Sequence, residues 1–351
     1  MGPGPCTPYP EAMEALGRPI MGHLDPEFLS IFDETRDRLR TVFGTANRVT
    51  IPVPGTGSAG MEAAFVNILN PGDTVVIAVN GMFGERMCDL AHRCDANVIP
   101  VNFEWGTPID PAVVSIAAYE AGAKMIAAVH AETSTGVLND IAALGAAKGD
   151  SLLLADCVTS IGGMVLDLDA WGVDIAYGGT QKCLGVPPGL APLTMTEAAW
   201  EQRVVKPRSW YFDLGVIGGH TPHAALAYHH TAPIAMIASL HAGLGAVLDE
   251  GLDNCVARHA TCGRALQDGL IGLGLELWVK EEDRLAQLTT VRVPDGVDSG
   301  ALRRELLSRY GIEIGAGVKE WSSKIWRIGC MGHAARLRNV ALLLSALDEL
   351  L

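Results

Sequence analysis

The sequence predicts an α/β protein: a mostly parallel, seven-stranded sheet in a large domain, followed by a smaller C-terminal α+β domain. Between about residues 49 and 195, short apolar runs alternate with segments of helix length, a pattern typical of βαβ crossovers. The runs are continuously apolar, as expected for strands that helices cover on both faces. After about residue 245, long helical stretches predominate, which indicates a second domain.

The individual elements follow from these patterns. Strands are expected at 49–53, 74–79, 97–101, 125–129, 152–155, 174–177 and 190–195. In the C-terminal part we expect helices at 255–273, 299–310 and 333–350, and strand-like pieces at 275–279, 287–293 and 325–328. The first fifteen residues are rich in glycine and proline, so we expect them to run extended without a helix. The expected division is therefore an N-terminal segment 1–15, a large domain 16–245 and a small domain 246–351.

Composition excludes several classes of function. The 351 residues are 49% hydrophobic, which is enough for two cores. The formal net charge is −14 and no basic cluster is visible, which argues against nucleic-acid binding. The eight cysteines are irregularly spaced without a C-x-x-C pair, and no signal peptide or membrane-length apolar run is evident. We therefore expect a reduced, cytoplasmic protein without a metal site.

A glycine-rich loop at 55–60 matches G-x-G-x-x-G between a strand candidate and a helix. A dinucleotide site would need an acid at the end of the second strand, but that strand is followed by Asn80 and Gly81, and Asp73 lies at its other end. Glycines and hydroxyls at a helix start suit a single phosphate group. An ordinary capped turn and an NAD-binding oxidoreductase remain the alternatives for this loop alone.

Lys182 and Asp156 suggest a chemistry that uses such a phosphate. Lys182 follows an apolar run at 174–177 and precedes a turn rich in glycine and proline, a poor place for a solvated side chain. Its amine can form a Schiff base with a carbonyl. Asp156 ends the strand at 152–155, where a carboxylate could pair with the pyridine nitrogen of pyridoxal phosphate. Taken alone, each residue also fits a surface lysine or a helix cap.

Seven motifs, in chain order, connect these features. They are 54–67 (PGTGSAGMEAAFVN), 80–84 (NGMFG), 130–136 (HAETSTG), 156–160 (DCVTS), 179–182 (GTQK), 228–233 (YHHTAP) and 326–329 (WRIG). Together they resemble the class V aminotransferases of pyridoxal phosphate fold type I, in particular the alanine–glyoxylate and serine–glyoxylate (serine–pyruvate) aminotransferases. The resemblance extends over nearly the whole chain, and it implies pyridoxal 5′-phosphate as the cofactor.

The resemblance also implies roles for individual residues. Lys182 would bind the cofactor covalently and transfer the proton, and Asp156 would pair with the pyridine nitrogen. Further cofactor contacts are implied for Thr56, Gly57, Ser58 and Gln181 at the phosphate, Phe83 and Val158 on the ring faces, Thr133 beside them, and Tyr228 and Thr231 at the phosphate of the neighbouring subunit of a homodimer. Arg327 would bind the substrate carboxylate, with Thr133 and the loop at Gly4 and Pro5 lining the same pocket.

The function expected is a ping-pong transfer of an amino group from alanine or serine to glyoxylate or pyruvate. One carboxylate-binding arginine and no evident second cation favour such small amino acids and 2-oxo acids over dicarboxylates. Ureidoglycine–glyoxylate and pyridoxamine–pyruvate aminotransferases remain alternatives. A pyridoxal phosphate lyase such as a cysteine desulfurase is another, although Cys330 lies in a packed motif. The segment 315–324 departs from the Gly-Gly-Leu-Gly common in the family, which leaves the donor open.

Overall fold

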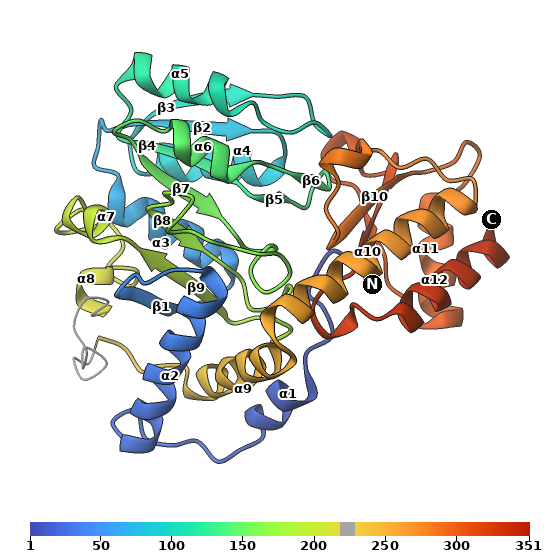
Figure 1. Ribbon diagram of the computed structural model, residues 1–351, viewed down its shortest axis with the longest axis horizontal. Coiled ribbons are helices and arrows are strands. Elements are labelled where there is room, and N and C mark those ends of the chain that lie inside the picture. The colour runs from blue at the N-terminus through green and yellow to red at the C-terminus, as the bar shows by residue number, and fades with distance from the viewer. Residues whose placement is uncertain (218–228) are drawn as a thin grey trace.

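A seven-stranded sheet runs through the larger part of the computed structural model, which describes residues 1–217 and 229–351 (Figure 1). The strand order is β1-β9-β8-β7-β4-β2-β3. The strands are β1 (Val49–Pro54), β2 (Thr74–Val79), β3 (Asn97–Asn102), β4 (Met125–Val129), β7 (Leu152–Asp156), β8 (Ile175–Tyr177) and β9 (Leu190–Met195). Only β9 is antiparallel to its neighbours. The predicted mostly parallel, seven-stranded sheet is confirmed, and each predicted strand end lies within one residue of the observed one.

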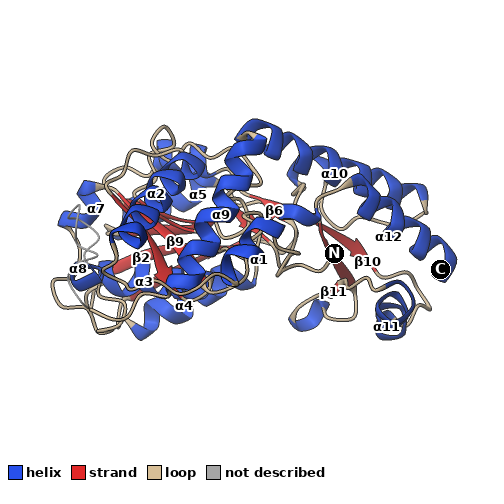
Figure 2. Ribbon diagram, turned by 90° about the horizontal axis from the view of Figure 1, so that it is seen from below, coloured by secondary structure: helices blue, strands red, loops and turns tan. Residues whose placement is uncertain are grey.

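The strands are continuously apolar because the sheet separates two cores. Along β7, Leu153 and Ala155 pack into one core, whereas Leu152 and Leu154 pack into the other. Successive side chains of a strand point to opposite faces, so both sets must be apolar when helices cover both faces. Figure 2 shows helices on both sides of this sheet.

The helices divide between the two faces of the sheet. The helices are α2 (Pro26–Phe43), α3 (Gly57–Ile68), α4 (Met82–Arg93), α5 (Pro111–Ala121), α6 (Ile141–Ala147), α7 (Glu197–Glu201), α8 (Leu214–Ile217) and α9 (Ile234–Glu250). Side chains of α3, α4, α7 and α8 enter one core, and side chains of α2, α5, α6 and α9 enter the other. Because α3 and α4 follow β1 and β2, their N-terminal ends lie at the carboxyl edge of the sheet. A two-stranded hairpin, β5 (Ala131–Glu132) and β6 (Val137–Leu138), follows β4 at the same edge.

The C-terminal part forms a separate three-stranded antiparallel sheet in the order β10-β12-β11. Its elements are α10 (Leu252–Gly272), β10 (Leu288–Arg292), α11 (Ser299–Tyr310), β11 (Gly315–Ala316), β12 (Ile325–Gly329) and α12 (Leu337–Leu350). The strand predicted at 275–279 is wrong, because only Leu277 forms an isolated bridge, to Val291. The helix predicted from residue 333 begins at Leu337, after a short 3-10 turn, Gly332–Ala334.

The prediction that the first fifteen residues form no helix is also wrong. Helix α1 (Pro10–Leu16) begins with proline at its first turn, where the missing N–H costs nothing and the fixed φ angle suits a helix. Ala12 and Ala15 are buried against the large domain, which stabilises the short helix. The expected boundary between residues 15 and 16 falls inside this helix.

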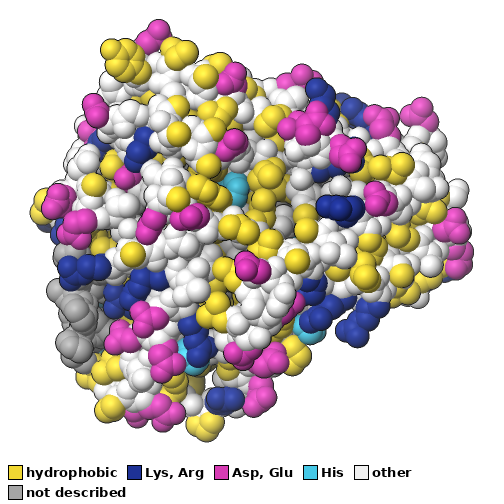
Figure 3. All heavy atoms as spheres, in the orientation of Figure 1, with side chains coloured by type: hydrophobic (Ala, Val, Ile, Leu, Met, Phe, Trp, Pro, Cys, Tyr) yellow, Lys and Arg dark blue, Asp and Glu magenta, His cyan; other side chains and the backbone are white. Residues whose placement is uncertain are grey.

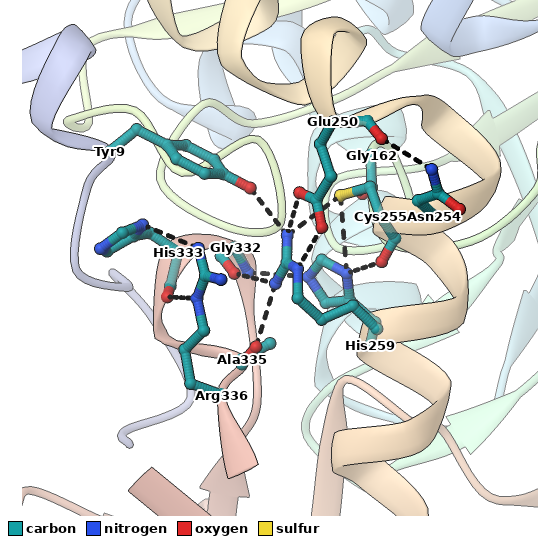
Figure 4. Close-up of polar contacts among 11 residues, drawn as sticks. Tyr9, Gly162, Glu250, Asn254, Cys255, His259, Gly332, His333, Ala335 and Arg336 are labelled. Carbon is teal, nitrogen blue, oxygen red and sulfur yellow. Dashed lines mark hydrogen bonds and ion pairs between the residues drawn. The ribbon is translucent and has the colours of Figure 1, made fainter. Parts of the chain in front are cut away.

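Arg258 on α10 joins three distant segments. Figure 4 labels its partners Tyr9, Glu250, Gly332 and Ala335. Its guanidinium donates to the Tyr9 hydroxyl oxygen at 2.9 Å, to the Gly332 and Ala335 carbonyls at 2.9 and 3.0 Å, and to the Glu250 carboxylate at 2.6 Å. The loop after β12 is thereby held against α10 and against the N-terminal segment. Several charge-assisted hydrogen bonds on one guanidinium make this a strong junction.

The surface and the interior exclude some kinds of site. On the face drawn in Figure 3, acidic and basic side chains are interspersed, in keeping with the net charge of −14. Within the residues that the structure describes, no helix combines the length and the apolar character needed to cross a bilayer. The same residues contain no group of three or more histidine, cysteine or acidic side chains arranged to hold a metal ion.

Candidate active site

A cavity of about 150 Å³ lies at the carboxyl ends of the central strands, where α3 begins. It is lined by Thr56, Gly57, Ser58, Met61, Phe83, Arg86, Val129, Ala131, Thr133, Asp156, Val158, Thr159, Gln181 and Lys182. Nine residues singled out in the sequence therefore meet in one place: Thr56, Gly57, Ser58, Phe83, Thr133, Asp156, Val158, Gln181 and Lys182. Ligands of open α/β sheets bind at this edge, beyond the carboxyl ends of parallel strands.

Lys182 projects into the cavity from the loop that connects β8 and β9. Its Nζ donates a hydrogen bond to the Pro3 carbonyl of the N-terminal segment. Burial of the ammonium group lowers the pKa of Lys182, because the charged form loses water. A larger fraction of neutral amine is what a nucleophilic or proton-accepting lysine requires.

Asp156 is the last residue of β7, and its carboxylate is almost completely buried. One oxygen accepts from the Val158 backbone N–H at 2.8 Å, and the other accepts from the Tyr177 hydroxyl at 2.8 Å. Both partners are neutral, and the carboxylate belongs to no ion pair of the described residues. Burial raises the pKa of Asp156 to about 6. A buried carboxylate without a counter-charge favours a cationic group in the cavity beside it.

The start of α3 is arranged to bind an anion. The side chain of the N-cap residue Thr56 makes no capping hydrogen bond, so its hydroxyl is available to a ligand. A Cβ atom at Gly57 would lie 2.6 Å from Val158 Cγ2, so only glycine allows this close approach. The Gln181 Oε1 atom is buried without a hydrogen-bond partner. A buried acceptor without a partner is satisfied by a hydrogen-bond donor, so this atom suits an N–H or O–H group of a ligand rather than an anion.

Glu132, on the β5–β6 hairpin, supports the other side of the cavity and was missed by the sequence argument. Its carboxylate accepts from the Phe83 backbone N–H at 3.2 Å and from the Ser134 N–H and hydroxyl at 3.0 and 2.6 Å. It therefore caps the first turn of α4 and fixes the position of the Phe83 ring. Burial raises the pKa of Glu132 to about 7. Its place inside the motif at 130–136 was the available signal.

Arg86 is a second cation on the cavity wall, in addition to Lys182, where the sequence showed no evident second cation to accompany the carboxylate-binding arginine. Its Nη1 donates to the Ser58 hydroxyl at 3.1 Å. Its Cζ lies 5.1 Å from the centre of the Phe83 ring, the residue one turn earlier on α4. Tyr177, the hydroxyl donor to Asp156, was missed as well, because it sits inside a strand that the sequence marks only as apolar.

Arg327 and Gly4 lie beside the cavity rather than on its wall. Arg327 projects from β12, where its Nε donates to the Ala316 carbonyl at 2.7 Å and its Nη1 to the Thr133 carbonyl at 3.3 Å. Burial lowers the pKa of Arg327, and the residue takes part in none of the ion pairs of the described chain. Gly4 has a φ of 111°, and a Cβ atom there would overlap the Lys182 side chain.

Two residues, Tyr228 and Thr231, are expected to serve a neighbouring subunit. Tyr228 lies outside the described residues. Thr231 is exposed just before α9 and is not among the residues that line the cavity. Their expected role stays a prediction.

The chain resembles known proteins over its whole length. The family described as aminotransferase class-V matches residues 6–329. The (S)-ureidoglycine–glyoxylate transaminase of Bacillus subtilis is 35% identical, covering 100% of this chain and 90% of its own. An alanine–glyoxylate aminotransferase of Drosophila melanogaster is 36% identical, with 99% and 91% covered. The crystal structure of the alanine–glyoxylate aminotransferase from Nostoc sp. superposes with a TM-score of 0.95 at 41% identity, covering 99% and 94%. The expected fold type I is confirmed by this superposition.

The raised pKa of Asp156 predicts a pH effect on stability. The folded, ligand-free protein keeps a proton on Asp156 that the unfolded chain releases above pH about 4. Stability is therefore lost as the pH rises towards about 6. Asp156→Asn removes this loss, so we expect the variant to gain about 2–3 kcal/mol relative to the native protein between pH 4 and pH 8.

Urea unfolding of the ligand-free proteins at a series of pH values measures this difference. Asp150→Asn, at an exposed position, is the matched control and should follow the native profile. Parallel pH profiles for Asp156→Asn and the native protein would contradict the prediction.

Proposed function

The chain belongs to the class V aminotransferase family, and we propose that it transfers the amino group of alanine or serine to glyoxylate or pyruvate with pyridoxal 5′-phosphate as cofactor. The observation that carries this proposal is the shared cavity of Lys182, Asp156 and the α3 N-terminus. The cavity thereby combines an amine, a buried carboxylate without an ion-pair partner and a site for an anion. Its relatives include alanine–glyoxylate aminotransferases at 36% and 41% identity.

The residues present fit this cofactor. The α3 N-terminus with the hydroxyls of Thr56 and Ser58 suits the phosphate. Asp156 suits a protonated pyridine nitrogen, because that cation would compensate the buried carboxylate. The side chains of Phe83 and Val158 supply apolar surfaces for the ring. When bound, the cofactor supplies an electron sink for the charge that develops on the substrate α-carbon.

Lys182 is the residue that moves the proton. Its lowered pKa favours a neutral amine, and Nζ could then accept the α-proton of the amino acid and hold it for later return. To do so, Nζ must leave the Pro3 carbonyl, to which it donates in the structure described here. The Asp156 carboxylate would pair with the ring nitrogen of the bound cofactor and favour its protonated form.

Arg327 is the residue that binds the substrate carboxylate. Two backbone carbonyls hold its Nε and Nη1, which orients the guanidinium without neutralising it. The remaining donors suit a carboxylate, which binds an arginine through two parallel hydrogen bonds. Thr133, whose carbonyl accepts from Nη1, links this arginine to the cavity wall.

Replacing Lys182 tests the proposal directly. Lys182→Ala should show no turnover of alanine, serine or glycine with glyoxylate or pyruvate, because no other amine lines the cavity among the described residues. In the native protein, the visible absorption band of the bound cofactor should bleach on addition of a donor; in the variant it should not respond. The exposed Lys206→Ala is the control and should behave as native. Transamination by Lys182→Ala would refute the assignment.

The same spectra distinguish a second candidate. The Bacillus subtilis relative is named for (S)-ureidoglycine, and it matches the entire chain at 35% identity. Bleaching by ureidoglycine at far lower concentrations than by alanine or serine would favour that donor. We expect alanine or serine to bleach the band at lower concentrations than ureidoglycine does.

Arg327→Gln should raise the KM for alanine about 10- to 100-fold, because a charge-assisted contact to the carboxylate is lost. The absorption spectrum of the bound cofactor should stay unchanged, since Arg327 does not line the cavity wall. Steady-state kinetics at varied alanine measures the effect. Arg292→Gln, which removes an exposed arginine of β10 paired with Glu276, is the control. An unchanged KM would exclude Arg327 as the carboxylate site.

We further propose that the active form is a homodimer. Large apolar side chains remain exposed, including Trp210 before α8 at 63% and Ile20 after α1 at 74%. Exposed apolar surface of this kind marks interaction sites. Light scattering should give a mass of about twice 37.1 kDa; a monomer that remains fully active would contradict the proposal.

A further inference from the structure

We propose that Arg86 binds the phosphate group of the cofactor and supplies the positive charge that the rest of the phosphate site lacks. The inference rests on the proposed function and adds a residue to the same site. The sequence assigned the phosphate to Thr56, Gly57, Ser58 and Gln181, none of which is charged. A phosphate monoester carries a charge of about −1.5 to −2 at pH 7, whereas a helix N-terminus offers only about +0.5.

The position of Arg86 carries the proposal. Arg86 lines the cavity, and its Nη1 donates to the hydroxyl of Ser58 at 3.1 Å. Ser58 is the second residue of α3, so the guanidinium lies beside the turn whose N–H groups would face the anion. The α4 helix brings it there, because Arg86 follows Phe83 by one turn and packs over its ring.

The neighbouring acids leave Arg86 free to bind an anion. On the same helix, Glu85 pairs with Lys319 and Asp89 pairs with Arg93. Arg86 itself takes part in no ion pair of the described residues. The ring of Phe83 covers the face of the guanidinium, which leaves its in-plane N–H groups for hydrogen bonds. A guanidinium has five such donors, and the contact with Ser58 uses one.

A second carboxylate of a dicarboxylic donor would be the competing ligand for this cation. The substrate carboxylate, however, is expected at Arg327, which comes from β12 and contacts Ala316 and Thr133. Arg86 comes from α4 and contacts the first turn of α3 instead. The positive charge of Arg86 also acts on Asp156. It lowers the pKa of that carboxyl, whereas burial raises the pKa by a larger amount. This places Arg86 on the cofactor's side of the site.

Comparing two forms of the cofactor tests the proposal. Ligand-free native protein and Arg86→Gln are titrated with pyridoxal 5′-phosphate and with pyridoxal, which lacks the phosphate, and binding is followed by absorbance. We expect Arg86→Gln to weaken binding of the phosphorylated form about 10- to 100-fold and to change binding of pyridoxal by less than about twofold. Arg93→Gln, which removes an exposed arginine of the same helix, is the matched control and should leave both affinities unchanged.

Each outcome decides the question. Equal losses for both ligands, or no loss for the phosphorylated form, would overturn the inference while leaving the proposed function intact. A loss confined to the KM of dicarboxylic donors would assign Arg86 to the substrate instead. Failure of the native protein to bind either form would refute the proposed function itself. If circular dichroism shows that Arg86→Gln does not fold, Arg86→Lys takes its place. We then expect a smaller loss of affinity that is still confined to the phosphorylated form, because lysine keeps the positive charge but lacks the paired N–H donors of a guanidinium.

Discussion

The buried carboxylate of Asp156 is the constraint around which the rest of the site is arranged. It ends the central strand β7, and a backbone N–H and the Tyr177 hydroxyl hold it in place without an ion pair among the described residues. A buried charge held only by neutral groups is costly until a cationic partner arrives. The parallel strands on either side bring the α3 and α4 N-termini to the same edge. The sheet thus places a buried carboxylate without an ion-pair partner next to a site for anions. Together the two suit a ligand that has a cationic and an anionic group.

Desolvation shifts the pKa of four ionisable groups at or beside this cavity, each in the direction of the neutral form. It raises the pKa of Asp156 and Glu132 and lowers the pKa of Lys182 and Arg327. The acids would become easier to protonate and the bases easier to deprotonate. For Lys182, this matches the need for a free amine. For Asp156, a cationic group of a ligand beside the carboxylate would stabilise the ionised form further.

Much of the large domain could be predicted from the sequence, because a strand covered on both faces leaves an uninterrupted apolar run such as 152–155. The small domain was harder: its strands are short, and residues 275–279 bond to β10 only around Leu277. Nine cavity residues were found because they follow strand ends or lie in motifs. Arg86 was missed because its role depends on how α4 is rotated, and Glu132 because its burial arises from the fold of a hairpin.

The N-terminal segment has a consequence for the order in which the protein can be assembled. The Met1 carbonyl accepts from the Gly329 N–H, the Cys6 N–H bonds to the Gln181 carbonyl, and Tyr9 meets Arg258 on α10. Residues 1–9 therefore find all these partners only after β12 has been synthesised. The central sheet can form earlier, whereas the contacts of the N-terminal segment around Lys182 are completed only once residue 329 is available. A nascent chain that stops before β12 would contain a formed sheet but an open catalytic centre.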